Sequence, residues 1–242
     1  MIAGIFHQGS GLGNQLHRYV AVRTLAEDKG YEWGMIYNPD GSGKEEGFKG
    51  KSFMDISYGK EVTDIPNKWL ENTNYYNPEF NFIEDNTIVD GEFQDPRYFE
   101  HRLVEIDEWL KVEPKWLLDN WCVIGFRGGE YSLYPDLFLT KEYWEQATNK
   151  MLEINPRMMF EVHTDDEELA RKFFPKFPVV QDIELNWRYM RYAKYAIIAN
   201  SSFYILPRLL SKGYTIAPRY WARRNLGIWS MPQNYYEQFT YI

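Results

Sequence analysis

The amino-acid sequence predicts an α/β protein with two Rossmann-like domains. Apolar, strand-like runs alternate with segments of helical periodicity along most of the 242 residues, an order typical of parallel βαβ units. The first run ends in a glycine-rich turn, and several later runs end in polar residues, where open parallel sheets place their ligands. The chain is long enough to bury roughly 70–75% of the surface that it exposes when unfolded.

Each element is predicted from its apolar periodicity. The first half contains strands at Ile2–Phe6, Tyr31–Tyr37 and Asn86–Phe93, helices at Gly13–Lys29 and 96–110, and loops with short elements over residues 38–85. The second half contains strands at Trp121–Phe126, Met158–His163, 177–181, 195–200 and 214–218, and helices at Lys141–Leu152, Asp166–Phe174, Leu185–Lys194 and 201–212. We place the domain boundary so that the domains are residues 1–115 and 116–242.

Composition excludes several classes of protein. The formal net charge is −8 and no long Lys/Arg cluster occurs, which disfavours a nucleic-acid partner. The single cysteine, Cys122, excludes an internal disulfide and a cysteine-rich metal site, and its apolar surroundings predict an inert core thiol. No signal peptide and no run of 18 apolar residues is visible, so we expect a cytoplasmic protein without a transmembrane segment. An aromatic content of 18% suits flat ligands such as sugars or bases.

The glycine-rich turn lies in HQGSGLGNQLHRY, His7 to Tyr19. The spacing of its glycines is G-x-G-x-G and not the G-x-G-x-x-G of dinucleotide-binding folds. The second predicted strand ends in Tyr37 and Asn38, without the carboxylate that such folds place against the ribose. The turn still presents backbone N–H groups to a polar or negative ligand, and a plain structural turn is the alternative.

The run VIGFRGGEY, Val123 to Tyr131, delivers Arg127 from a buried strand into a Gly-Gly turn, with Glu130 three residues later. The guanidinium offers a fixed fork of donors that suits a diphosphate. The alternative is a surface ion pair between Arg127 and Glu130.

Two further strand ends carry polar residues. In FEVHTDDEEL, Phe160 to Leu169, Thr164 or Asp165 can cap the following acidic helix, and the functional alternative is a carboxylate that accepts from the N–H edge of a base. In IIANSSFYILPRLL, Ile197 to Leu210, two serines open a helix, which makes an anion site, an N-cap, or both.

Taken in order, six segments resemble the α-1,2-fucosyltransferase family, whose members use GDP-fucose. The family opens with G-G-L-G-N-Q-L-F-Q-Y-A, and this chain reads GSGLGNQLHRYVA. The family segments G-Y-F-Q-x-x-x-Y-F and H-x-R-R-G-D-Y correspond to GEFQDPRYF and GFRGGEY. The segments F-x-x-x-S-D-D, I-x-A-N-S-S-F-S-W-W and I-A-P-x-x-W correspond to FEVHTDD, IIANSSFYIL and IAPRYW.

The resemblance implies a GT-B type enzyme, in which two Rossmann-like domains face each other across a cleft. Residues 1–115 would form the acceptor side and residues 116–242 the nucleotide-sugar side. The implied reaction moves fucose from GDP-fucose to a hydroxyl of a glycan acceptor with inversion, and requires no metal or other cofactor. Contact with a membrane surface is left open.

The resemblance also implies site residues. Arg127 would bind the diphosphate, Asn14 would face the sugar, and Glu130 would be the general base, with His7 and His17 as weaker candidates for the base. The donor-binding set is Gly11, Gly13, Arg127, His163, Asp165, Asp166, Asn200, Ser201, Ser202 and Phe203.

This chain departs from the family pattern at Gly125, Gly128 and Glu130, where the family has His, Arg and Asp, and at Tyr204 and Ile205. Two alternative interpretations follow. The first is a relative that binds a nucleotide or a sugar without catalysis. The second is a transferase with a different donor, whose pocket is enlarged by the two glycines.

Overall fold

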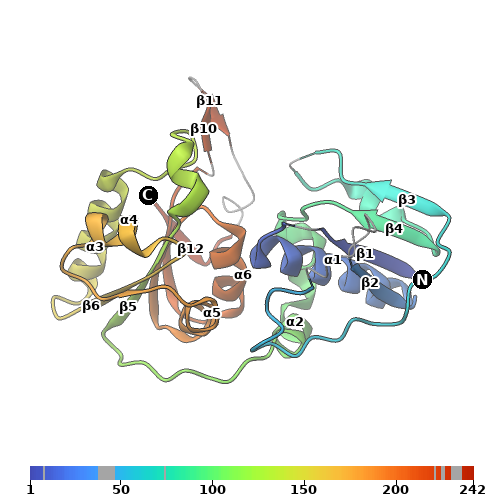
Figure 1. Ribbon diagram of the computed structural model, residues 1–242, viewed down its shortest axis with the longest axis horizontal. Helices are drawn as coiled ribbons and strands as arrows, with labels where there is room; N and C mark the ends of the chain where they lie inside the picture. The colour runs from blue at the N-terminus through green and yellow to red at the C-terminus, as the bar shows by residue number, and fades with distance from the viewer. Residues whose placement is uncertain (8, 38–46, 74, 221, 225–226, 230–235) are drawn as a thin grey trace. The chain divides into compact units, whose positions relative to one another are not determined.

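The computed structural model describes residues 1–7, 9–37, 47–73, 75–220, 222–224, 227–229 and 236–242 (Figure 1). The chain forms two compact units, Met1–Val112 and Glu113–Ile242. The domain boundary predicted from the sequence lies between residues 115 and 116. Each unit is an α/β structure around its own parallel sheet.

Unit 1 contains a four-stranded sheet in the order β2-β1-β4-β3, and its ladders are parallel. Its strands are β1 (Ile2–Phe6), β2 (Trp33–Tyr37), β3 (Asn67–Leu70) and β4 (Thr87–Asp90), and its helices are α1 (Leu12–Lys29), α2 (Leu103–Trp109) and the short 3₁₀ turns η1 (Pro78–Phe82), η2 (Pro96–Tyr98) and η3 (Glu100–Arg102).

Unit 2 contains a six-stranded sheet in the order β12-β9-β8-β5-β6-β7, also with parallel ladders. Its strands are β5 (Trp121–Phe126), β6 (Met159–Thr164), β7 (Val179–Val180), β8 (Tyr195–Ile198), β9 (Tyr214–Ala217) and β12 (Phe239–Tyr241), beside a two-stranded antiparallel hairpin of β10 (Ala222–Arg224) and β11 (Gly227–Trp229). Its helices are α3 (Lys141–Ile154), α4 (Glu167–Phe173), α5 (Ile183–Tyr192), α6 (Ser202–Leu210) and the 3₁₀ turn η4 (Gly129–Leu133).

Close packing in unit 1 places α1 directly on β1. β1 is buried along its whole length, as expected for a central parallel strand. A Cβ on Gly4 would come within 2.8 Å of Val22 and 2.9 Å of Met35, so glycine allows this approach. The helix ends at Gly30, whose φ of 67° closes a left-handed C-cap.

The core of unit 2 positions the end of β5. The ring of Phe126, the last residue of this strand, contacts the rings of Phe138, Trp144, Phe173 and Phe174 at centroid distances of 5.2–6.0 Å. Cys122 lies buried in the same strand, as predicted, and burial raises the pKa of its thiol. Since β5 is fixed by this cluster, the backbone that leads into Arg127 is fixed as well.

The structure corrects three predictions about elements. The segment 96–110 is not one helix, because Asp95 caps the 3₁₀ turn η2 and α2 begins only at Leu103. The strand predicted at 214–218 is not the last, because β12 extends the edge of the sheet beyond it. The N-cap of α4 is Asp166, and not Thr164 or Asp165. Within the described residues, no helix combines the length and apolar character needed to cross a membrane.

Candidate functional site

Six of the predicted donor-binding residues gather at the carboxyl edge of the unit 2 sheet. β5 lies between β6 and β8. The strands β6 and β7 are added on one side of β5 and the strands β8 and β9 on the other, and ligands of open parallel sheets bind at such a switch point. The residues that follow these three adjacent strands are Arg127 after β5, Asp165 and Asp166 after β6, and Asn200, Ser201 and Ser202 after β8.

Arg127 is held by an aspartate and a tyrosine. Its Nη1 lies 2.6 Å from Oδ2 of Asp165, and its guanidinium lies 5.2 Å from the centroid of the Tyr131 ring. The predicted partner Glu130 is farther, at 3.5 Å from Nη2, and its side chain is 69% exposed. The buried Nε of Arg127 has no acceptor among the described residues. The side chain is therefore fixed on one side and keeps donor capacity on the other.

Both aspartates predicted to contact the base already accept backbone N–H groups. Oδ1 of Asp165 accepts the N–H of Gly128 at 2.9 Å while its other oxygen binds Arg127. Asp166 accepts the N–H of Leu169 at 3.0 Å as the N-cap of α4. Asp165 therefore holds the turn after β5, and Asp166 has the capping role that the sequence analysis assigned to Thr164 or Asp165.

His163 does not fit the predicted donor role. Its side chain is fully buried, its Nε2 lies 2.8 Å from Oε1 of Glu161, and its ring lies 4.6 Å from that of Tyr189. An imidazole enclosed in this way has no face for a donor sugar or nucleotide.

The serines lie at the start of α6, as predicted. Ser201 occupies the N-cap position with no side-chain capping bond, and Ser201 and Ser202 are 6% and 8% exposed. The side chain of Asn200 donates to the carbonyl of Leu137 at 2.9 Å, which ties the loop after β5 to the end of β8. The ring of Phe203 packs against those of Trp187 and Tyr204. The first N–H groups of α6 thus lie at the same sheet edge as Arg127.

The two glycines do not enlarge this edge of the sheet. A Cβ on Gly125 would lie 2.7 Å from the ring of Tyr204, and one on Gly128 would lie 2.7 Å from Cβ of Asp166. The Tyr204 hydroxyl donates across the strand ends to the carbonyls of Phe126, at 3.0 Å, and His163, at 3.2 Å. Tyr204 fills the space that Gly125 leaves, which overturns the expectation of a wider donor pocket.

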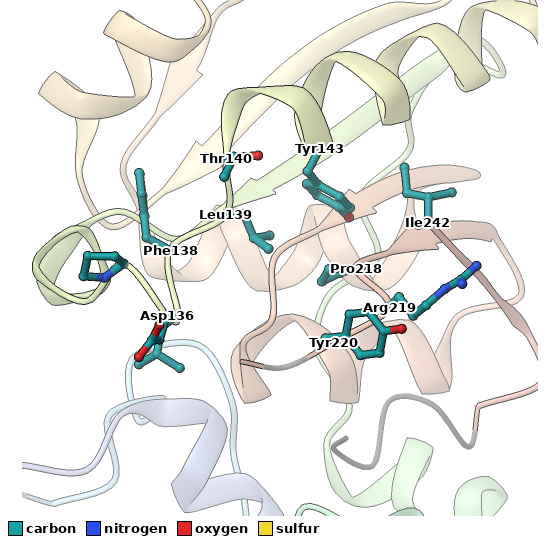
Figure 2. A pocket seen from close by; sticks show the side chains of 11 residues that line it. Asp136, Phe138, Leu139, Thr140, Tyr143, Pro218, Arg219, Tyr220 and Ile242 are labelled. Atoms are coloured by element: carbon teal, nitrogen blue, oxygen red, sulfur yellow. The ribbon is translucent and has the colours of Figure 1, made fainter. Parts of the chain in front are cut away.

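A cavity of about 310 Å³ opens beyond the loop after β5 (Figure 2). The side chains that line it include Asp136, Phe138, Tyr143, Arg219 and Tyr220. None of the predicted site residues lines it, but Leu137, which does, accepts the bond from Asn200. The segment TIAPRYW in the sequence contains Arg219 and Tyr220 and was the signal that could have located this cavity.

The remaining predicted residues, Gly11, Gly13 and Asn14, lie in unit 1. Gly11 is the N-cap of α1, and a Cβ there would meet no described atom within 4 Å. Oδ1 of Asn14 accepts from Nε2 of Gln94 at 3.2 Å. The glycine loop thus lies against the segment that follows β4, which carries the motif GEFQDPRYF.

Arg18 joins these two segments and was missed by the sequence analysis. It is 5% exposed, and its guanidinium donates to the carbonyl of Gly91 at 2.6 Å, to the hydroxyl of Ser10 at 2.8 Å and to the carboxylate of Glu92. Burial raises the pKa of Glu92, against the opposing charge of Arg18. Arg18 therefore fixes the glycine loop to the end of β4.

A strained turn supports the same edge of unit 1. Glu71, directly after β3, accepts the N–H groups of Glu92 and Phe93 at 2.7 and 3.0 Å. Phe93 has a φ of 47°, which is uncommon for a residue with a side chain. Such strain persists only where the surroundings impose it, and it concentrates at functional sites.

Within the described residues, no group of three or more His, Cys, Asp or Glu side chains could hold a metal ion.

Comparisons with known proteins gave matches among solved structures alone. No family model matches the chain, and no curated protein does. It is similar to E. coli heptosyltransferase WaaC with ADP, at 11% identity and a TM-score of 0.46, over 100% of this chain and 92% of that one. It is also similar to fucosyltransferase NodZ from Bradyrhizobium, at 13% identity and a TM-score of 0.44, over 86% and 93% of the two chains. Since both TM-scores lie below 0.5, the function proposed below rests on the residues of this chain.

Proposed function

We propose that the chain is a glycosyltransferase that moves fucose from GDP-fucose to a hydroxyl of a glycan acceptor, with inversion and without a metal. The observation that carries the proposal is the position of Arg127 at the end of the central strand β5, beside the start of α6. Departure of a diphosphate builds negative charge on its β-phosphate oxygens. A guanidinium and a helix N-terminus are groups that stabilise such charge.

The diphosphate would bind Arg127 through the donors that Asp165 leaves. Asp165 holds Nη1 at 2.6 Å, whereas the contact of Nη2 with Glu130 is 3.5 Å and exposed. Ser201 and Ser202, with the first N–H groups of α6, would take the remaining phosphate oxygens. Asn14, Gly11 and Gly13 are proposed to face a sugar in unit 1.

The base of the nucleotide would enter the cavity lined by Phe138, Asp136 and Tyr220. A volume of about 310 Å³ accommodates a purine ring. Tyr220 offers a ring for stacking, and the carboxylate of Asp136 offers an acceptor for the N–H edge of a guanine. This assignment replaces Asp165, whose two oxygens bind Gly128 and Arg127, and Asp166, whose Oδ1 caps α4.

A second candidate function is that of a relative that binds a nucleotide or sugar without transferring it. The ion pair between Arg127 and Asp165 favours this alternative, because it already neutralises the guanidinium that the reaction needs. The two functions differ in what an acceptor does to bound GDP-fucose. The transferase releases GDP when an acceptor is added, and the non-catalytic relative does not.

The test is calorimetric titration with GDP-fucose, GDP, GDP-mannose, UDP-sugars and pyrophosphate, followed by turnover with a panel of glycosides that includes lactose. A charge-assisted hydrogen bond contributes about 1.5–3 kcal/mol, so Arg127→Ala should weaken GDP-fucose binding roughly 10- to 100-fold. Tyr220→Ala should weaken GDP binding but leave pyrophosphate binding unchanged.

The matched control is Arg171→Ala, which removes an exposed arginine paired with Glu167 on α4 of the same unit. It should bind like the wild-type chain, and EDTA should not alter turnover. Binding of GDP-fucose without release of GDP in the presence of any acceptor would favour the non-catalytic relative. Folded protein that binds no nucleotide would exclude the transferase and leave only a relative that binds a sugar.

A further inference from the structure

His7 and Asp90 form a hydrogen-bonded pair at the carboxyl edge of the unit 1 sheet. His7 follows β1 directly and Asp90 is the last residue of β4, and these strands are neighbours in the sheet. Nε2 of His7 lies 2.7 Å from Oδ1 of Asp90. The second carboxylate oxygen of Asp90 lies 3.3 Å from Nζ of Lys68 on β3. Three adjacent strands therefore define the position of one imidazole.

The contact with Asp90 determines which ring nitrogen of His7 can accept a proton. An ionised carboxylate can only accept, so Nε2 carries the proton of neutral His7 and Nδ1 carries a lone pair. Burial by itself would raise the pKa of Asp90, but His7 and Lys68 together lower it, which keeps the carboxylate ionised. Nδ1 has no hydrogen-bond partner within the described part of the chain, and the side chain is 36% exposed. A proton acceptor is thus oriented by one nitrogen and accessible at the other.

The charged groups shown around His7 come from β3, from β4 and the segment that follows it, and from α1. Besides Asp90 and Lys68, the carboxylate of Glu92 acts on His7, and Arg18 binds that carboxylate from α1. The two carboxylates and the two cations carry no net charge together, so the net charge of this cluster depends on the charge of the His7 imidazole. His7 lies two residues before Gly9 in the glycine-rich turn that leads into α1, where Asn14 is proposed to face a sugar.

We propose that His7, oriented by Asp90, is the catalytic base that takes the proton from the acceptor hydroxyl, an inference that rests on the proposed transferase function. The acceptor O–H bond breaks and the proton bonds to Nδ1. The oxygen forms the new bond to the anomeric carbon, and the bond from that carbon to the diphosphate breaks, with its electron pair leaving on the diphosphate. Asp90 is a positioning residue, which holds the tautomer and stabilises the imidazolium that forms.

His7 fits this role better than Glu130. The nearest described cation to Glu130 is Arg127, at 3.5 Å, which is the group assigned to the diphosphate. A base at that position would compete with the leaving group for the same guanidinium. His7 and Asp90 face no such conflict, because the cations near them bind the two carboxylates.

The experiment compares His7→Gln and Asp90→Asn with a matched pair of controls. His101 and Asp28 form another His–Asp contact in unit 1, with Nε2 2.8 Å from Oδ2, away from the strand ends. Turnover of GDP-fucose with the best acceptor of the glycoside panel is measured from pH 5 to 9, together with the dissociation constant of GDP-fucose. His101→Gln and Asp28→Asn should leave both quantities within about twofold of wild type.

Loss of a general base lowers a rate by about 10²–10⁴-fold, and His7→Gln should lower kcat within that range while GDP-fucose binding stays within about threefold. The acid limb of the wild-type pH profile should disappear. Asp90→Asn should lower kcat by at least about tenfold and move that limb to lower pH, because the imidazolium loses its carboxylate.

Wild-type turnover that survives His7→Gln within about threefold would overturn the assignment of the base and leave the proposed function standing. A wild-type chain that binds no nucleotide sugar would overturn both. Loss of turnover together with GDP-fucose binding in His7→Gln would place His7 in a structural role and also overturn the assignment.

Discussion

At the scale of single residues, His17 is the group whose burial has the clearest consequence for stability. Its imidazole is fully buried in α1, where Nδ1 donates to the carbonyl of Gly13 at 2.9 Å and the ring meets the edge of Phe99. Nε2 has no partner among the described residues. Burial lowers the pKa of His17 from 6.5 to about 4, and the hydrogen bond to Gly13 offsets this only in part.

The sign of the resulting pH dependence follows from proton uptake. Between pH 6.5 and 4 the unfolded chain binds a proton at His17 that the folded chain does not, so stability falls as the solution becomes more acid. The His17 contribution is complete above pH 6.5 and is lost as the pH falls towards 4. For these two pKa values the loss at pH 5 is about 2 kcal/mol.

We therefore predict that His17→Phe reduces the loss of stability between pH 7 and pH 5 by about 2 kcal/mol. Phenylalanine fills a similar volume and cannot be protonated. Urea unfolding of the full chain at both pH values measures the difference. His101→Gln, at an exposed histidine, is the control and should not change the pH dependence. Equal acid sensitivity of His17→Phe and wild type would contradict the burial argument.

Adjacent residues also mark the limit of prediction from the sequence. Asp165 and Asp166 are indistinguishable as letters, yet Asp165 binds Arg127 and Gly128 while Asp166 caps α4. The position of Arg127 at a strand end was predictable from the apolar run before it. Which carboxylate would face it depends on the direction of each side chain at the end of β6, and no periodicity in the sequence encodes that direction.

At the scale of elements, α6 is fixed to the sheet by Arg208 and Tyr204, to which the sequence analysis gave no structural role. Arg208 is fully buried and donates to Thr215, Met190 and Ala193, so it links β9 and the end of α5. Burial lowers the pKa of Arg208 to about 9. One turn earlier, Tyr204 crosses the ends of β5 and β6. The start of α6 is therefore held rigidly beside Arg127, as a phosphate site requires.

We predict that Gly125→Ala destabilises unit 2 by about 1–3 kcal/mol, because the new methyl overlaps Tyr204 at 2.7 Å and meets Met190 at 3.0 Å. Tyr204→Leu should lower the free energy of unfolding less in the Gly125→Ala variant than in the wild type. The coupling energy between the two substitutions should be at least about 1 kcal/mol. Thermal unfolding of the two single variants and the double variant measures this coupling.

The control for this cycle is Gly47→Ala, since a Cβ there would meet no described atom within 4 Å. It should change stability by less than about 0.5 kcal/mol. If Gly125→Ala is equally neutral, the space beside β5 is open and the wider donor pocket expected from the sequence returns as an explanation.

Most elements were predictable because each carries a strong local signal. The buried runs of β1 and β5 and the helices α4 and α5 follow from apolar periodicity, but the aspartates that cap the two helices, Asp166 and Asp182, were not predicted. β12 was not, because three residues, FTY, have no periodicity of their own, and only pairing with β9 makes them a strand.

At the scale of the whole molecule, each unit has its own sheet and its own core. In unit 1 the rings of Phe80, Phe93 and Tyr98 contact one another, and in unit 2 the rings gather around Phe126. Residues 111–118 between them form no helix or strand, and the side chain of Trp116 is 91% exposed. Independent cores joined by an irregular segment are typical of separate domains.

We therefore predict that the two units keep their folds after the connection is cut. A specific protease site inserted after Trp116 should be cleaved readily, because the backbone there belongs to no sheet or helix. Each purified fragment should show cooperative unfolding and retain the near-ultraviolet circular dichroism of its packed aromatic rings. The same protease site inserted into α3, within the core of unit 2, should be cut slowly in the native protein. A fragment that loses its near-ultraviolet signal would have an incomplete core on its own, and the two-domain interpretation of the sequence would then fail for that half.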